Sequence, residues 1–279
     1  MTTSEPRQRI SPRGAGGSVL AQGLRLHYLE YGTSHKSLVI VPGITSPAIT
    51  WEFVAEELAR DFRVYTMDVR GRGLSDRARA GGYGLPDYAA DVAGFVEALQ
   101  LDRPVVLGHS MGARIVSAAG ALFPESRGPL IVVDPPLSGP GREPYPFPLE
   151  TYVDALAEVH EGATAEDMRR YFPTWSEEQL QIRADWLATC DETAVVETYH
   201  NFHREDFFEH WATVGPPVLF MYGLESPVVP ASALDEVRAA NPGAELVGVP
   251  RSGHMIPWDN LPAFIDEVRR FATSAVSAA

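Results

Sequence analysis

The chain has 279 residues, a hydrophobic content of 45% and a formal net charge of −14 at pH 7. So large a surplus of negative charge argues against nucleic acids and anionic membranes as partners, because both require basic surfaces. The length and hydrophobic content are sufficient for one large α/β domain with a sizeable core.

Cysteine content and the first residues bear on location. Cys190 is the only cysteine, so no internal disulfide can form, and the sequence predicts a reducing, cytoplasmic compartment. Residues 1–18 contain arginines without a following apolar run, so we expect a flexible tail and no signal peptide. No apolar run is long enough to cross a bilayer.

Predicted strands and helices alternate over the first half of the chain. Apolar and polar residues alternate at 24–32, which predicts an edge strand, whereas continuous apolar runs predict buried strands. Buried strands are expected within 37–43, 63–73, 104–109 and 129–136, and helices at 51–62, 85–101 (starting near Asp87) and 110–124.

The alternation stops near residue 140 and resumes near residue 213. Residues 140–212 open with a Pro/Gly-rich stretch and continue as helical segments without a buried strand. Strands are expected again within 216–223 and 244–254, followed by a helix at 261–275.

We therefore predict an α/β fold with a mostly parallel central sheet and helices on both faces. Residues 19–139 and 213–279 would form this core, and residues 140–212 a helical cap. An insertion at this point would lie over the carboxyl ends of the strands, where open α/β sheets bind ligands.

The pentapeptide Gly-His-Ser-Met-Gly at 108–112 has the pattern G-x-S-x-G and lies between a predicted strand and a predicted helix. In that setting the pattern is typical of a nucleophile elbow, a tight turn that presents a serine above the sheet. We expect Ser110 to be the nucleophile; the alternative is that it is only a turn residue. A serine hydroxyl requires a base, and His254 follows the last predicted strand, as the chain order Ser–acid–His requires.

The acid that would orient His254 has two candidates. In a common form of this design the acid follows the strand within 216–223, but that position is Ser226, directly after Glu225. Asp134 ends the preceding strand, which should be the neighbour in the sheet, so its carboxylate is within reach of the same histidine. We favour Asp134 over Glu225; the alternative role for Asp134 is that of a turn residue before two prolines.

An oxyanion requires two backbone N–H donors. We expect one from Met111, directly after the nucleophile, and one from Ile44, in the loop after the strand within 37–43. A simple core contact is the alternative for Ile44.

Six stretches of the sequence resemble a known family. The chain is similar to α/β-hydrolases over nearly its whole length. More narrowly, it is similar to the N-formylmaleamate deformylase type of amidohydrolase, which acts in nicotinate degradation, and to the related type that hydrolyses (acetamidomethylene)succinate. The elbow and the "DVRGRGLS" stretch are generic to the superfamily, whereas "PGITSPAITW" and "DPPLSGPGR" are specific. The similar stretches are 41–58, 68–75, 108–114, 133–142, 174–187 and 253–261.

The resemblance implies both a triad and a reaction. It places the nucleophile at Ser110, the base at His254 and the acid at Asp134, relocated from the position that is Ser226 here. The implied reaction is hydrolysis of a C–N bond to an acyl group, formyl in the first instance, on a small unsaturated acid. It implies no metal and no organic cofactor.

Such a substrate carries a carboxylate, which in a chain of this net charge needs a local arginine. Arg142 is the favoured candidate because it lies at the start of the predicted cap, and Arg169 is a further one; a salt bridge is the alternative for each. Tyr171 and Trp175 are expected to line the site and exclude water, with packing as the alternative. Weaker cap candidates are Arg170, Arg183, Tyr145 and Phe147, whereas a structural role is favoured for Arg70 and Arg72.

Two rival functions remain open at this point. A carboxylesterase or C–C bond hydrolase would use the same triad in an apolar pocket without an arginine. A non-catalytic small-molecule receptor would not need the triad. The expected partner is a small anionic organic molecule; a homodimer is compatible with the sequence, which does not fix the oligomeric state. Because H-E-x-x-H is absent, no metal is expected at the cap histidines His200, His203 and His210.

Overall fold

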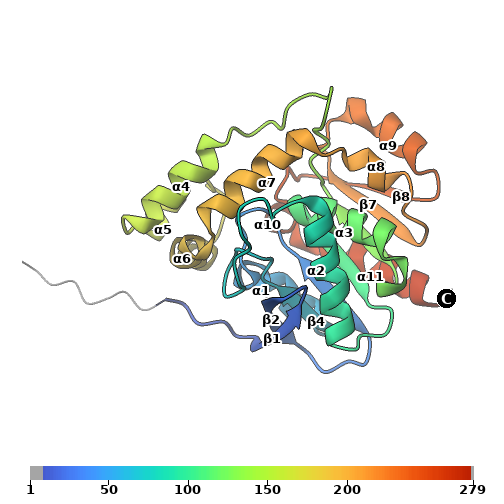
Figure 1. The fold of residues 1–279 in the computed structure, drawn as a ribbon, viewed down its shortest axis with the longest axis horizontal. Coiled ribbons are helices and arrows are strands. Elements are labelled where there is room, and N and C mark those ends of the chain that lie inside the picture. Colours follow the sequence, from blue (N-terminus) through green and yellow to red (C-terminus); the bar gives the residue numbers. More distant parts are fainter. Residues whose placement is uncertain (1–8, 278–279) are drawn as a thin grey trace, which may run out of the picture.

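The centre of the fold is an eight-stranded sheet with helices on both faces (Figure 1). The structure is a computed structural model and describes residues 9–277. The spatial order is β1-β2-β4-β3-β5-β6-β7-β8, antiparallel at β1, β2 and β4 and parallel from β4 to β8. The mostly parallel sheet is therefore confirmed. The strands are β1 (Ala15–Ala21), β2 (Leu24–Tyr31), β3 (Ser37–Val41), β4 (Arg63–Met67), β5 (Val105–His109), β6 (Leu130–Val133), β7 (Val218–Gly223) and β8 (Glu245–Val249).

The prediction of an edge strand at 24–32 was wrong, because β1 forms the edge. β1 pairs antiparallel with β2 along its whole length, through a two-residue turn at Gln22 and Gly23. Both turn residues have positive φ, 50° and 76°, which matches the twist of a hairpin. The expected flexible tail at 1–18 therefore needs correction for its last four residues, which belong to β1; residues 1–8 lie outside the described residues.

Two apolar clusters cover the two faces of the sheet, because successive residues of a buried strand point to opposite sides. In β3, Val39 packs in the cluster beneath α2 and α3, and Ile40 in the cluster beneath α1 and α11. The helices are α1 (Glu52–Leu58), α2 (Leu85–Ala98), α3 (Met111–Leu122), α4 (Glu150–His160), α5 (Ala165–Met168), α6 (Glu177–Trp186), α7 (Glu192–Arg204), α8 (Phe207–Trp211), α9 (Leu234–Ala240), α10 (Ile256–Asp259) and α11 (Leu261–Ser277).

Helix α2 starts at Leu85 rather than at Asp87. Gly84 precedes the first turn, and the Asp87 carboxylate accepts a hydrogen bond from the Gly84 N–H at 3.3 Å. Asp87 thus acts from the third helical position as half of a capping box.

Helices α4 to α7 follow β6 and lie together at one side of the sheet (Figure 1). No strand occurs between β6 and β7. Helix α8, which the predicted cap included, instead packs against α3 and α9 of the core. Its Trp211 is fully buried, and the indole N–H donates to the Val237 carbonyl of α9 at 2.9 Å. Among residues 9–277, no helix combines the length and apolar character needed to span a bilayer.

Candidate active site

Ser110 lies in a strained turn between β5 and α3. Its φ is 57°, in the left-handed region that residues other than glycine rarely adopt. The flanking glycines are required by close backbone approach: a Cβ on Gly108 would lie 2.1 Å from the Gly112 carbonyl oxygen, and a Cβ on Gly112 1.9 Å from that of Val41. The turn therefore has the geometry that the G-x-S-x-G pattern predicts.

His254 connects Ser110 to Asp134. Its Nε2 is 2.9 Å from Ser110 Oγ, and its Nδ1 is 2.7 Å from Asp134 Oδ2. Because an ionised carboxylate only accepts hydrogen bonds, Nδ1 carries the proton and Nε2 is left to accept from the serine hydroxyl. This is the arrangement in which an imidazole can act as general base.

The structure brings Asp134, and not Glu225, to the histidine. The fully buried Asp134 carboxylate accepts hydrogen bonds from His254 Nδ1, from the Gly223 N–H at 3.1 Å and from Ser226 Oγ at 2.6 Å. Glu225 is exposed. The residue at the more usual position of the acid, Ser226, therefore donates to an acid that reaches across from the neighbouring strand.

His109, inside the elbow, holds the base in place. Its Nε2–H donates to the His254 carbonyl at 2.8 Å, and the two rings are 4.9 Å apart. Burial, with the proximity of His254 as a second cause, lowers the pKa of His109 to about 3. The ring is therefore neutral at pH 7 and adds no competing charge beside the base.

The two predicted oxyanion donors flank the nucleophile. Ile44 lines the same cavity as Ser110, and a Cβ on the preceding Gly43 would lie 3.5 Å from the Ser110 Cβ. Met111 is the first residue of α3, so its N–H has no acceptor within the helix. Both residues therefore lie beside Ser110, and it stays a prediction that their N–H groups hold the oxyanion.

A cavity of about 220 Å³ opens over Ser110 and His254. One wall comes from the core and the opposite wall from the helices that follow β6, so the cap closes the site. Tyr171 and Trp175 line it, as the sequence predicted. Trp175 stacks between Phe172 and Trp258, with ring centroids 4.1 Å and 4.9 Å away.

The two favoured arginines do not line this cavity. Arg142 lines a separate cavity of about 400 Å³ and forms a two-pronged ion pair with Glu236, at 2.9 Å and 3.0 Å. Arg169 is partly exposed and pairs with Glu166 and Glu177. Both guanidinium groups are paired with carboxylates and lie outside this cavity, so the structure lends no support to their binding substrate, which stays a prediction.

Arg183 of α6, ranked below them, lies in the wall of the cavity. It is 6% exposed, and its Nη2 donates to Thr45 Oγ1 at 2.7 Å while Nη1 donates to the Thr45 carbonyl. Its buried Nε has no partner, and no carboxylate of the described residues pairs with it. Burial lowers the pKa of Arg183. Its position three residues after the buried Leu180, on the inner face of a helix, was the available signal.

One of the cap histidines, His203, forms hydrogen bonds within the cap. His203 Nε2 accepts a hydrogen bond from the Tyr145 backbone N–H at 3.2 Å, and its Nδ1 lies 3.3 Å from the Tyr199 carbonyl. Across residues 9–277, no cluster of three or more His, Cys, Asp or Glu side chains could hold a metal ion.

Comparisons with known proteins agree with this architecture. A family model described as alpha/beta hydrolase fold matches residues 36–261. The chain is 46% identical over 250 residues to the N-formylmaleamate deformylase of Pseudomonas putida, covering 90% of this chain and 93% of that protein. It is 28% identical over 227 residues to the 2-(acetamidomethylene)succinate hydrolase of Mesorhizobium japonicum, covering 77% and 80%.

A solved structure shows the same likeness in three dimensions. The crystal structure of the N-formylmaleamic acid deformylase from Pseudomonas putida S16 superimposes with a TM-score of 0.87 at 40% identity, covering 91% of this chain and all of that one. The chain therefore belongs to the alpha/beta hydrolase family and is a hydrolase.

Proposed function

We propose that this hydrolase cleaves the C–N bond between a formyl or other small acyl group and the nitrogen of a small unsaturated carboxylic acid, with N-formylmaleamate as the leading substrate. The observation that carries the proposal is the hydrogen-bonded series Ser110–His254–Asp134 in a small cavity that also holds Arg183. The similarity to N-formylmaleamate deformylase supports the acyl group and the acid.

In the first half of the reaction, Ser110 Oγ attacks the formyl carbonyl carbon and His254 Nε2 takes the hydroxyl proton. The N–H groups of Ile44 and Met111 donate to the oxygen that becomes negative. The C–N bond then breaks, His254 returns the proton to the leaving nitrogen, and maleamate departs. Asp134 stabilises the imidazolium while it holds the extra proton.

In the second half, water attacks the formyl ester on Ser110. His254 accepts a proton from that water and delivers it to Ser110 Oγ as the ester bond breaks. Formate leaves, and the serine hydroxyl and neutral imidazole are restored. The leaving nitrogen belongs to an imide, so it departs more readily than that of a simple amide, and the side chains of this chain suffice for every proton transfer.

Arg183 supports an anionic substrate. A buried guanidinium without a carboxylate is unfavourable by several kcal/mol unless a partner compensates it. The substrate carboxylate would be that partner, because Arg183 lines the cavity over Ser110 while its Nη1 and Nη2 hold Thr45. An apolar pocket lacking an arginine would have favoured a neutral ester. The presence of Arg183 therefore favours an anionic substrate over the neutral ester of a general carboxylesterase.

Product analysis tests the proposal. We expect the enzyme to convert N-formylmaleamate into formate and maleamate in equal amounts, as followed by proton NMR. A neutral p-nitrophenyl ester tests the rival carboxylesterase activity, and a vinylogous 1,5-diketo acid tests the rival C–C bond hydrolase activity. Ester cleavage without formate would leave a working triad and reject the substrate; cleavage of the diketo acid alone would establish the C–C bond hydrolase.

A further inference from the structure

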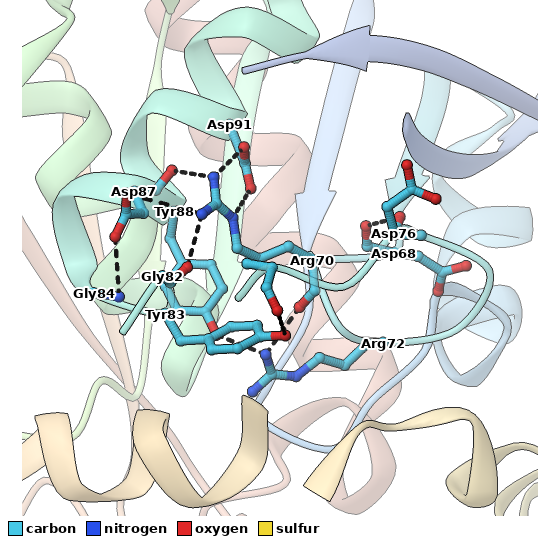
Figure 2. A network of polar contacts seen from close by, with 12 residues as sticks. Asp68, Arg70, Arg72, Asp76, Gly82, Tyr83, Gly84, Asp87, Tyr88 and Asp91 are labelled. Carbon is cyan, nitrogen blue, oxygen red and sulfur yellow. Dashed lines mark hydrogen bonds and ion pairs between the residues drawn. The ribbon is translucent and has the colours of Figure 1, made fainter. Parts of the chain in front are cut away.

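Arg72 is a fully buried cation on the turn after β4 that pairs with no carboxylate of the described residues. Its neighbour Arg70, on the same turn, pairs with Asp91 through two hydrogen bonds, at 2.6 Å and 2.7 Å. Figure 2 shows the two side chains leaving the turn in different directions, Arg70 toward Asp91 and Arg72 toward the Tyr88 hydroxyl. The sequence alone indicated one structural role for both, and their contacts separate them.

The Arg72 side chain contacts Ile44 and Met111, the two residues that lie beside Ser110 in the site. Nε–H donates to the Ile44 carbonyl at 3.0 Å, and Nη2 lies 3.7 Å from Met111 Sδ. These are the two residues whose N–H groups are proposed to hold the oxyanion. They are 67 positions apart in sequence, and Arg72 contacts both.

The same guanidinium also donates hydrogen bonds to α2 and to the cap helix α7. Nη1 donates to the Tyr88 hydroxyl at 2.6 Å, and Nη2 donates to Thr198 Oγ1 at 3.1 Å and to the Ala194 carbonyl at 3.2 Å. The preceding Gly71 permits this contact with α7, because its φ is +74° and a Cβ would lie 2.6 Å from the Ala194 Cβ. The position of α7 is thus linked to the loop that carries Ile44 through a single side chain.

We propose that Arg72 is a positioning residue that fixes the two oxyanion donors relative to Ser110 and holds that geometry against cap helix α7. The inference deepens the proposed function, because it needs a nucleophilic Ser110 but not a particular acyl group. An oxyanion donor contributes only when it lies within hydrogen-bond distance of the developing charge. A guanidinium fixed by several acceptors restrains the Ile44 loop in a way that a shorter or more mobile side chain cannot.

The test compares Arg72→Lys with Arg70→Lys. The second substitution also replaces a guanidinium of this turn by an ammonium group, but Arg70 does not contact Ile44 or Met111. Arg72→Lys is expected to lower kcat about 30-fold with KM changed less than about 3-fold, since a misplacement near 1 Å costs on the order of 100-fold. It should weaken binding of a small trifluoromethyl ketone, whose Ser110 adduct places a charged oxygen in the hole, by a similar factor. Arg70→Lys should lower stability and leave both quantities near wild type.

Equal losses of kcat and inhibitor affinity in Arg72→Lys and Arg70→Lys would overturn the proposal, because a general structural role predicts that result. Should Arg72→Lys fail to fold, Tyr88→Phe removes the shorter of the two hydrogen bonds that Nη1 donates, at 2.6 Å, and leaves the one to the Arg70 carbonyl at 3.0 Å. It is expected to lower kcat and inhibitor affinity together by several-fold, and wild-type values for both would equally overturn the proposal. Measuring both N-formylmaleamate and a p-nitrophenyl ester separates this outcome from failure of the proposed substrate, since the ester needs the same oxyanion hole.

Discussion

Replacing Asp134 with asparagine is expected to lower kcat for formate release about 10⁴-fold, because a neutral amide neither fixes the His254 tautomer nor stabilises the imidazolium. The carboxylate is fully buried and accepts the hydrogen bond from His254 Nδ1 at 2.7 Å. The measurement is steady-state kinetics at pH 7, with circular dichroism to verify folding.

Glu225→Gln is the matched control for that substitution. Glu225 stands directly before the more usual position of the acid and is exposed, so the change should leave kcat within about 2-fold, as is common for surface substitutions. Loss of activity in Glu225→Gln with activity kept in Asp134→Asn would show that the acid had been assigned to the wrong strand.

The second large effect is expected at Arg183. Substitution by methionine keeps much of the apolar volume of the side chain. It should reduce kcat/KM for N-formylmaleamate roughly 100-fold, which corresponds to a loss of about 3 kcal/mol, because truncating one partner of a buried charge pair typically costs this much. Cleavage of a neutral p-nitrophenyl ester should fall far less, because that substrate has no carboxylate for Arg183 to bind. Initial rates over a range of both substrates give the two values.

Arg142→Met is the control for the loss of an arginine charge outside the cavity over Ser110. Its guanidinium is already paired with Glu236 and Asp206 and lies outside the cavity over Ser110, so kcat/KM should change by less than about 2-fold. If Arg142→Met lowered kcat/KM roughly 100-fold while Arg183→Met left it unchanged, Arg142 and not Arg183 would be the ligand of the substrate carboxylate.

The triad could be predicted from sequence because each member follows directly from a local pattern. Ser110 lies in a turn that its glycines define, Asp134 directly follows the buried strand β6, and His254 lies in the loop that follows the last strand, β8. Since parallel strands present their carboxyl ends at one edge, residues in these positions are expected to converge. The sheet and the helices on its two faces follow from the same alternation of patterns.

The substrate arginine could not be predicted in the same way, because the helices of the cap have no fixed relation to the sheet. Arg142 and Arg183 both lie in stretches that resemble the family, and only the packed structure shows that Glu236 neutralises the first. Whether a charged side chain is paired depends on residues distant in sequence. The hairpin at the edge was missed for a similar reason: a Gly-rich strand has little apolar pattern of its own and depends on its partner β2.

Covalent labelling tests most directly the central claim, that Ser110 is the nucleophile of this hydrolase. Methanesulfonyl fluoride is small enough to approach Ser110 Oγ in a cavity of about 220 Å³ and transfers its sulfonyl group to an activated serine with loss of fluoride. We predict one sulfonyl group per chain, on the peptide that contains Ser110, with formate release lost in proportion and labelling slowed by maleamate. Formate release that survives complete sulfonylation of Ser110 would contradict the account.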